Sequence, residues 1–284
     1  MFFKNLTAFK VTQFDIYNFE EKLNKLAFIP CSKIQKSARG FVNPFFKDEA
    51  CLHTFNNLAV FCFMSEDKIL PAQVINQEAA EYIEELQKTR FVGKKEKTEI
   101  KEDIEQRLLP QAFSKYKKIF GYFDLTNNYL VIDNVADKQI TEIIELIQRC
   151  EVKVEPIVKE ETNILTEWFT DNANPLDVEI GDKCKLTSDI GDGVANISCQ
   201  GSSMLNDNIK SFIETGGHIT EMAIVWAEQL AMTVNTKLQL KGIKFLDGIV
   251  DLNKDEQSHE ADLLLMSDIF AELIKSMQNW DTED

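Results

Sequence analysis

The sequence predicts an α+β fold in which most strands run antiparallel and amphipathic helices pack against them. Apolar and polar residues alternate along residues 3–14 and again along 218–250, as they do in strands buried on one face. Residues 137–150 and 260–280 instead carry apolar residues at helical spacing. The tripeptide Thr-Asn-Asn at 126–128 separates two short apolar runs and is typical of a hairpin turn.

The N-terminal part of the chain is expected to alternate strands with short helices. Apolar residues at every second position predict strands, whereas a spacing of three and four residues predicts helices. In order, we expect a strand at 3–14, a helix at 18–27, loop or extended backbone around Pro30, Gly40 and Pro44, a buried strand at 58–64, a turn at 65–68 and a further extended segment from Lys68.

Residues 76–107 are expected to form a projecting helical hairpin. Its first arm has one apolar face and one face rich in glutamate, and the segment Phe-Val-Gly at 91–93 interrupts it. The second arm, from Lys97 to about Arg107, is polar on nearly every side, so it buries little apolar surface. The Leu-Pro pair at 109–110 ends this arm, because proline cannot continue a helix. We therefore expect the hairpin to extend from the body, with basic residues near its tip and its base.

The rest of the chain is expected to pair further strands with helices. We expect two strands within 119–133, a helix at 137–150, a strand at 152–158, a helix at 162–170, small strands and turns over 176–201, a short helix at 205–215, a strand meander over 218–250 with turns near 235–236, 241–242 and 247–248, and a closing helix at 260–280. The chain then has four parts: an N-terminal α+β part at 1–75, the projecting helical segment at 76–118, a strand-helix part at 119–160 that completes the N-terminal half, and an acidic C-terminal α+β part at 161–284.

The formal net charge of −16 disfavours a nucleic-acid partner, because like charges repel. The distribution of the charge along the chain weakens that objection. Residues 1–150 hold 21 basic and 21 acidic side chains, whereas residues 151–284 hold 10 and 26. Within the neutral half, residues 22–47 contain six basic and no acidic side chains, and residues 88–118 contain ten and five. A surface built from these two stretches can bind phosphate, because salt screens distant acids beyond about 10 Å.

The sequence lacks the usual motifs of an enzyme or a metal protein. It has no phosphate-binding glycine loop, no dinucleotide-binding glycine motif and no His-Glu-x-x-His motif. Its six cysteines form no Cys-x-x-Cys pair and its three histidines are scattered, so no zinc site is expected. We expect a non-catalytic protein without cofactor or metal. No apolar run approaches the roughly 20 residues of a membrane span and no signal peptide is evident, so we expect a cytoplasmic location.

Basic residues beside the two breaks of the hairpin, and in the first basic stretch, are the candidate DNA contacts. They are Lys33, Lys36, Arg39, Lys88, Arg90, Lys94, Lys95, Lys97, Lys115, Lys117 and Lys118, with Phe113 as an aromatic side chain that can stack on or wedge into nucleic acid. Lysine predominates and makes point contacts to phosphate, which favours binding without sequence preference. The alternatives are a solvated helical protrusion without a partner, and a Phe113 that packs in a core.

Short segments along the whole chain match, in order, segments of one known family. They are Phe2-Phe3-Lys4-Asn5-Leu6, Ala27-Phe28-Ile29-Pro30-Cys31, Gly40-Phe41-Val42, Lys68-Ile69-Leu70-Pro71 with Val74-Ile75, Leu108-Leu109-Pro110-Gln111-Ala112-Phe113-Ser114, Leu165-Thr166-Glu167-Trp168, Leu240-Lys241-Gly242-Ile243-Lys244-Phe245 and Glu260-Ala261-Asp262-Leu263-Leu264-Leu265-Met266. Through these segments the chain resembles the RdgC family of recombination-associated, nucleoid DNA-binding proteins.

The resemblance implies a horseshoe-like protomer that closes with a second copy into a ring-shaped homodimer around double-stranded DNA. It implies binding without sequence preference, no cofactor, and basic residues lining the hole. It also implies a nucleoid-associated role in replication-fork repair and in restraining the access of the RecA recombinase, which would be a partner indirectly through DNA. The chain departs from the family at Gln111, at 198–203 and at Glu221, where the family carries basic residues. These departures predict a weaker grip on DNA or a weaker ring closure, or contacts that are rebuilt from other residues.

Two other functions stay open on the sequence alone. The first is a protein-interaction inhibitor that acts directly on the recombinase through the acidic C-terminal half, without needing DNA. The second is an uncharacterised nuclease, since 47 acidic residues can place carboxylates together. Asp124 and Asp133 flank the expected hairpin, and we interpret them as turn or edge residues.

Overall fold

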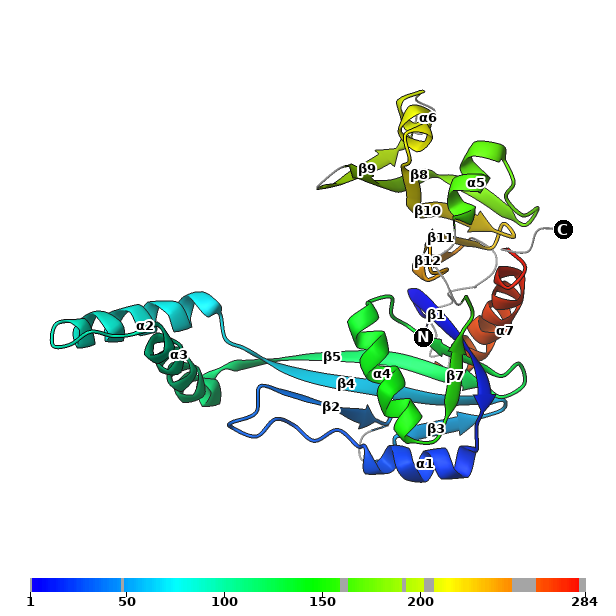
Figure 1. The fold of residues 1–284 in the computed structure, drawn as a ribbon. Coiled ribbons are helices and arrows are strands. Elements are labelled where there is room, and N and C mark those ends of the chain that lie inside the picture. The colour runs from blue at the N-terminus through cyan, green and yellow to red at the C-terminus, as the bar shows by residue number, and fades with distance from the viewer. Residues whose placement is uncertain are drawn as a thin grey trace. The chain divides into compact units, whose positions relative to one another are not determined.

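The computed structural model describes residues 2–46, 49–158, 163–190, 193–201, 207–246 and 259–280. Within them the fold is α+β, as predicted, with seven α-helices and a twelve-stranded antiparallel open sheet (Figure 1). The strands are β1 (Asn5–Gln13), β2 (Ser37–Val42), β3 (Leu52–Phe55), β4 (Leu58–Ile69), β5 (Phe113–Asp124), β6 (Tyr129–Ile132), β7 (Lys153–Pro156), β8 (Val178–Ile190), β9 (Gly193–Gln200), β10 (His218–Trp226), β11 (Leu230–Asn235) and β12 (Leu240–Phe245). The helices are α1 (Ile16–Lys25), α2 (Ala72–Gln87), α3 (Lys94–Leu108), α4 (Asp137–Arg149), α5 (Ile164–Asp171), α6 (Asp207–Glu214) and α7 (His259–Met277), with a 3-10 turn η1 (Leu109–Gln111).

The sheet runs in the order β2-β4-β5-β6-β1-β12-β11-β10-β8-β9, with β3 on β4 and β7 on β1. The chain divides into two compact units: unit 1 comprises residues 1–19, 53–60 and 120–284, and unit 2 comprises 20–52 and 61–119. Strands β4 and β5 contribute residues to both units. The four parts expected from the sequence stay a prediction. No helix of the described residues is long and apolar enough to span a membrane.

In unit 1, β1 pairs with β6, β7 and β12. The amphipathic helix α4 forms because Ile140, Ile143 and Ile147 recur at helical spacing, and all three are buried. The hairpin between β5 and β6 turns where expected. The Asp124 carboxylate accepts hydrogen bonds from the backbone N–H groups of Thr126 and Asn127, at 2.9 and 3.0 Å. Turn chemistry therefore accounts for Asp124.

Asp133 has an edge role of the same kind. Its carboxylate accepts hydrogen bonds from the N–H groups of Lys4 and Asn5, at 3.1 and 2.8 Å. Burial raises the pKa of this carboxyl, while the hydrogen bonds partly oppose the shift. Both interpretations made from the sequence are confirmed, because each carboxylate accepts hydrogen bonds from backbone N–H groups.

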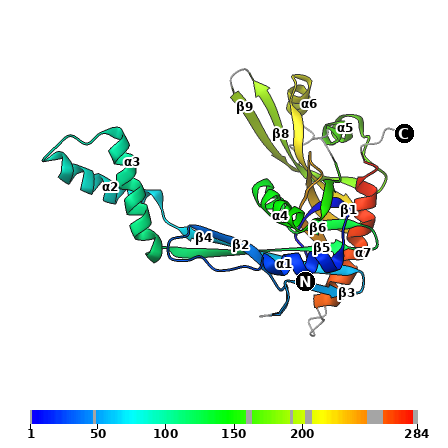
Figure 2. The ribbon, with the colours of Figure 1, turned by 60° about the horizontal axis from the view of Figure 1, so that its bottom comes forward.

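In unit 2, α2 and α3 pack on each other through a small apolar core of their own. Ala79 from α2, Val92 from the connection, and Ile100 and Ile104 from α3 are buried together. The two helices lie at the ends of β4 and β5 (Figures 1 and 2). The predicted helical pair, with its break at 91–93, is confirmed: α2 ends at Gln87, and Gly93 is the N-cap of α3.

A close backbone contact holds the segment between α1 and β2. Phe28 donates its N–H to the Phe41 carbonyl at 2.8 Å, and Phe41 donates to the Leu26 carbonyl at 3.0 Å. A Cβ atom at Gly40 would lie 2.5 Å from the Phe28 Cα, so only glycine allows this approach. The contact fixes one end of the loop that carries Lys33 and Lys36.

Three local predictions were wrong. The turn expected at 65–68 does not form, because β4 continues to Ile69 with Ser65 and Glu66 buried inside it. The small strands and turns expected over 176–201 are one long hairpin of β8 and β9, paired from Lys183↔Gln200 to Ile190↔Gly193 (Figure 2). The turn expected at 241–242 is part of β12, where Gly242 takes a φ of +66° without ending the strand. The turn expected near 247–248 lies outside the described residues.

Candidate nucleic-acid interface

The candidate basic residues of the helical pair lie in the connection between α2 and α3 and at the start of α3. Val92 is buried in the small core, whereas the side chain of its neighbour Phe91 is 87% exposed. Around Phe91, the structure places Lys88 at the C-cap of α2 and Lys94 and Lys95 in the first turn of α3, all exposed. Lys97 follows on α3 and is partly exposed. An exposed aromatic ring among lysines can stack on a base while the lysines contact phosphates.

Arg90 is engaged within this connection. Its guanidinium donates to both carboxylate oxygens of Glu96, with Nη1 2.9 Å from Oε2. The paired Arg90 lowers the pKa of Glu96, and Glu96 raises the pKa of Arg90. Lys95 lies 3.8 Å from the Glu99 carboxylate on an exposed helix face, which is a weak interaction. Lysine rather than arginine is therefore the cation that this connection presents to a ligand.

The start of β5 holds the second group of candidates. Successive strand residues point to opposite faces, so Phe113, Lys115 and Lys117 share one face, and Lys118 lies on the other. All four side chains are exposed, and Phe113 is 83% exposed. The alternative of a core phenylalanine at 113 is wrong.

A hydrogen-bond network marks the opposite face of β5. Glu66 of β4 is buried, and its carboxylate accepts hydrogen bonds from the Ser114 hydroxyl at 2.5 Å and the Tyr116 hydroxyl at 3.1 Å. The backbone N–H of Cys31 donates to it at 2.7 Å. These donors, Ser114 first, hold the pKa of Glu66 below its usual value. The network fixes β5 against β4 and so orients the Phe113 face outward.

The first basic stretch contributes less than expected. Lys33 is exposed in the loop before β2. Lys36 bonds Glu105 of α3 at 2.6 Å. Arg39 donates to the Asp67 carboxylate at 2.7 Å and to the carbonyls of Ala38 and Glu66 at 2.9 and 3.0 Å. Arg39 therefore bonds residues of β4 and of its own strand, and Lys36 forms an ion pair with α3. Lys33 is exposed in its loop, where a ligand can reach it.

The structure therefore assembles the candidates into two groups along α3. The first group lies near Phe91, just before and at the start of α3, and the second lies near Phe113, just after α3 ends. A helix of 15 residues spans about 22 Å at 1.5 Å per residue. Sequence reasoning missed Phe91, which it treated only as part of a break, although an aromatic between two basic runs is itself a signal.

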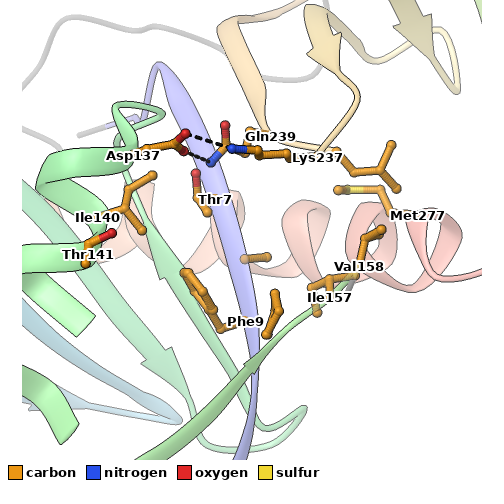
Figure 3. Close-up of a pocket in the computed structure, with 13 residues that line it drawn as sticks. Thr7, Phe9, Asp137, Ile140, Thr141, Ile157, Val158, Lys237, Gln239 and Met277 are labelled. Carbon is orange, nitrogen blue, oxygen red and sulfur yellow. Dashed lines mark hydrogen bonds and ion pairs between the residues drawn. The ribbon is translucent and has the colours of Figure 1, made fainter. Parts of the chain in front are cut away.

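Unit 1 contains a pocket of about 450 Å³ between β1, α4, β7 and the residues before β12 (Figure 3). Lys237 bonds the Asp137 carboxylate at 2.8 Å at its rim, and Gln239 donates to the same carboxylate at 3.3 Å. Lys237 is the main cause of a lowered pKa at Asp137. Within the pocket lining, these two bonds join Asp137 to Lys237 and Gln239.

The part of the chain that the structure describes holds no candidate metal site: no group of three or more of its His, Cys, Asp or Glu side chains could hold a metal ion. All six cysteines are described, and none of them is in a disulfide. The described residues thus define a basic and aromatic surface of unit 2 and no ligand set for a metal.

Comparisons with known proteins bear on the whole chain. A family model described as "Putative exonuclease, RdgC" matches residues 1–281. A protein of Yersinia pestis (strain Pestoides F) named "Recombination-associated protein RdgC" is 30% identical over 293 residues, which cover 98% of this chain and 96% of the relative. A protein of the same name from Psychromonas ingrahamii is also 30% identical, over 98% of this chain and 97% of the relative.

Proposed function

Because the chain belongs to the RdgC family, which supports a role in recombination, we propose that it binds double-stranded DNA without sequence preference as a ring-shaped homodimer. In this role it restrains the access of the RecA recombinase to DNA and assists replication-fork repair, with RecA affected through the DNA. It acts in the cytoplasm on the nucleoid, without catalysis and without a cofactor.

One observation carries the proposal of DNA binding: Phe113, Lys115 and Lys117 share an exposed face at the start of β5. Because Phe113 is 83% exposed, its ring is accessible to a partner. Aromatic side chains beside cations suit duplex or single-stranded nucleic acid, where the ring wedges or stacks and the cations bind phosphate.

The arginines of unit 2 support the absence of sequence preference. There are three, and each is paired with a carboxylate: Arg39 with Asp67, Arg90 with Glu96, and Arg107 with Glu78. A guanidinium is the usual bidentate reader of guanine in the major groove, and here each already has an acidic partner. The exposed lysines make point contacts to phosphate, which are blind to sequence.

The spacing of the two groups fits a duplex. The roughly 22 Å length of α3 corresponds to about six base pairs at about 3.4 Å each, so both groups can contact one DNA segment. The acidic surplus lies in residues 151–284, which carry 26 acidic and 10 basic side chains. Salt screens any of these charges that lies more than about 10 Å from a phosphate bound at the lysines.

A nuclease is the second candidate, because the description of the matching family model names an exonuclease. The described residues hold no metal-ligand group of the size a two-metal nuclease uses. The relatives at 30% identity are instead named recombination-associated proteins, and for that reason we rank DNA binding without cleavage first.

The test measures binding of the full chain to linear and covalently closed duplexes of unrelated sequence across a salt series, with the particle mass determined in the same buffers. We expect a dimer that binds all sequences alike, loses affinity steeply with salt, and slides off linear but not closed DNA. Absence of binding at low salt would overturn the proposal and favour an acidic inhibitor that acts directly on the recombinase. Loss of DNA integrity on addition of Mg²⁺ or Mn²⁺ would overturn the non-catalytic part.

A further inference from the structure

Two cysteines face each other across the β8–β9 hairpin of unit 1. In the antiparallel register, Cys184 of β8 lies directly opposite Cys199 of β9. Directly opposed residues have Cα atoms about 4.5–5.5 Å apart, within the range of about 4.4–6.8 Å that a disulfide bridges. Sequence spacing gave no hint of this pair, because the cysteines are separated by a hairpin that was expected as small strands.

The surroundings of the pair are closed to large molecules and open to small ones. Cys184 is 4% exposed and Cys199 is 9% exposed. Both nevertheless line a pocket of about 280 Å³, together with Lys183, Lys185 and Glu221. Lys185 and Glu221 are joined by an ion pair of 2.7 Å beside it. Among the described strands, β9 is at the edge of the sheet and pairs with β8 alone, so local opening of this edge gives a further route to the thiols.

We propose that Cys184 and Cys199 are a redox-modification site, at which a low-molecular-weight disulfide converts the two thiols into one cross-strand disulfide. The thiolate of one cysteine attacks a sulfur of the small disulfide, breaks its S–S bond and releases one small thiolate. The second cysteine then attacks the mixed disulfide, forms the Cys184–Cys199 bond and releases the second small thiolate. Two electrons pass to the small disulfide, and the two cysteine protons end on the two small thiols.

The rate of this exchange is set by burial. Burial is the main cause that raises the pKa of the Cys184 thiol to about 12, and the neighbouring Cys199 adds to it. Few thiolates exist at neutral pH, so the reaction is slow and becomes faster as the pH rises. Once formed, the bond joins β9 to β8 covalently near the open end of the hairpin and restrains the edge strand.

The experiment incubates the full-length protein with oxidised glutathione, blocks the remaining thiols, and maps the cysteines by peptide mass spectrometry. We expect a species about 2 Da lighter than the reduced protein, for the two hydrogens removed, with the linkage Cys184–Cys199. Its backbone amides in β9 should exchange with deuterium several-fold more slowly than in the reduced protein. Glutathione adducts at Cys184 or Cys199 that never resolve, or protection of both thiols until global unfolding, would overturn the proposal.

Matched variants separate the pair from the other thiols. Cys31 is the one cysteine that is not buried, so Cys31→Ser removes the most accessible thiol and should leave the cross-strand linkage intact. Cys184→Ala and Cys199→Ala should each abolish it. A linkage that persists in either alanine variant, or that needs Cys31, contradicts the assignment. The mapping of the unmodified chain decides the question even if an alanine variant fails to fold.

Discussion

Replacing Lys115 and Lys117 by glutamine tests whether the outward face of β5 contacts DNA. Both side chains are exposed and share a face with Phe113, so the double variant K115Q/K117Q removes two cations and little packing. Each phosphate contact contributes a slope of about 0.9 to the dependence of log affinity on log salt, so the loss of two contacts lowers the slope by about 1.8. Over a fourfold rise in salt, the unmodified protein should therefore lose about tenfold more affinity than the variant.

Fluorescence anisotropy with a labelled duplex, repeated across a salt series and with a second unrelated sequence, measures this slope. Lys118→Gln is the control: the structure places this candidate on the face of β5 opposite Phe113, where Ser114 and Tyr116 bond Glu66, and the change removes one like charge from the same strand. The control should leave the slope nearly unchanged. An equal effect of Lys118→Gln, or an unchanged slope in the double variant, would refute the assignment of the Phe113 face.

Three further predictions follow from burial and hydrogen bonding. Phe113→Ala should weaken duplex binding by about 1–3 kcal/mol and leave the melting temperature unchanged, since the ring is 83% exposed; a melting temperature that falls with affinity would place the ring in the fold instead. Ile104→Ala, in the small core between α2 and α3, should destabilise the helical pair by about 2–4 kcal/mol, seen as faster hydrogen exchange in both helices; unchanged exchange would contradict that core. The pKa of Glu66 is lowered in the folded state, chiefly by Ser114, so the ionised carboxylate stabilises the fold above its ordinary pKa of 4.5, and this stabilisation is lost as the pH falls below that value. Melting curves from pH 6 to pH 3 should therefore show a smaller fall in melting temperature for Glu66→Gln than for the unmodified protein.

Much of the local structure could be predicted because local forces dominate there. The helical pair was expected from apolar residues at helical spacing and from the break before Gly93, and α2 and α3 form on both sides of that break. The hairpin at 126–128 was expected from its turn residues, and Asp124 holds it through their N–H groups. Neighbouring residues supply these interactions, so a single sequence contains the information.

The misplaced turn in β4 shows where local reasoning ends. Ser65 and Glu66 are polar, and polar residues after an apolar run favour a turn. Glu66 is nevertheless buried within a strand, because donors from residues 31, 114 and 116 satisfy its carboxylate. Those residues are distant in sequence, so no local pattern around Glu66 predicts their contacts with its carboxylate.

The candidate interface divides in the same way. The sequence by itself determined which stretches are basic, that lysine exceeds arginine in them, and, through its matching segments, the family. Only the tertiary structure decided which basic side chains are paired with a carboxylate. Such pairing depends on long-range contacts, such as that between Lys36 and Glu105, which are 69 residues apart. It also decided that Phe113 is exposed and that Cys184 opposes Cys199. The face on which a strand residue lies, and the residue opposite it, depend on pairing between segments that are distant in sequence. Composition and local spacing do not depend on that pairing, so they can be read from the sequence alone.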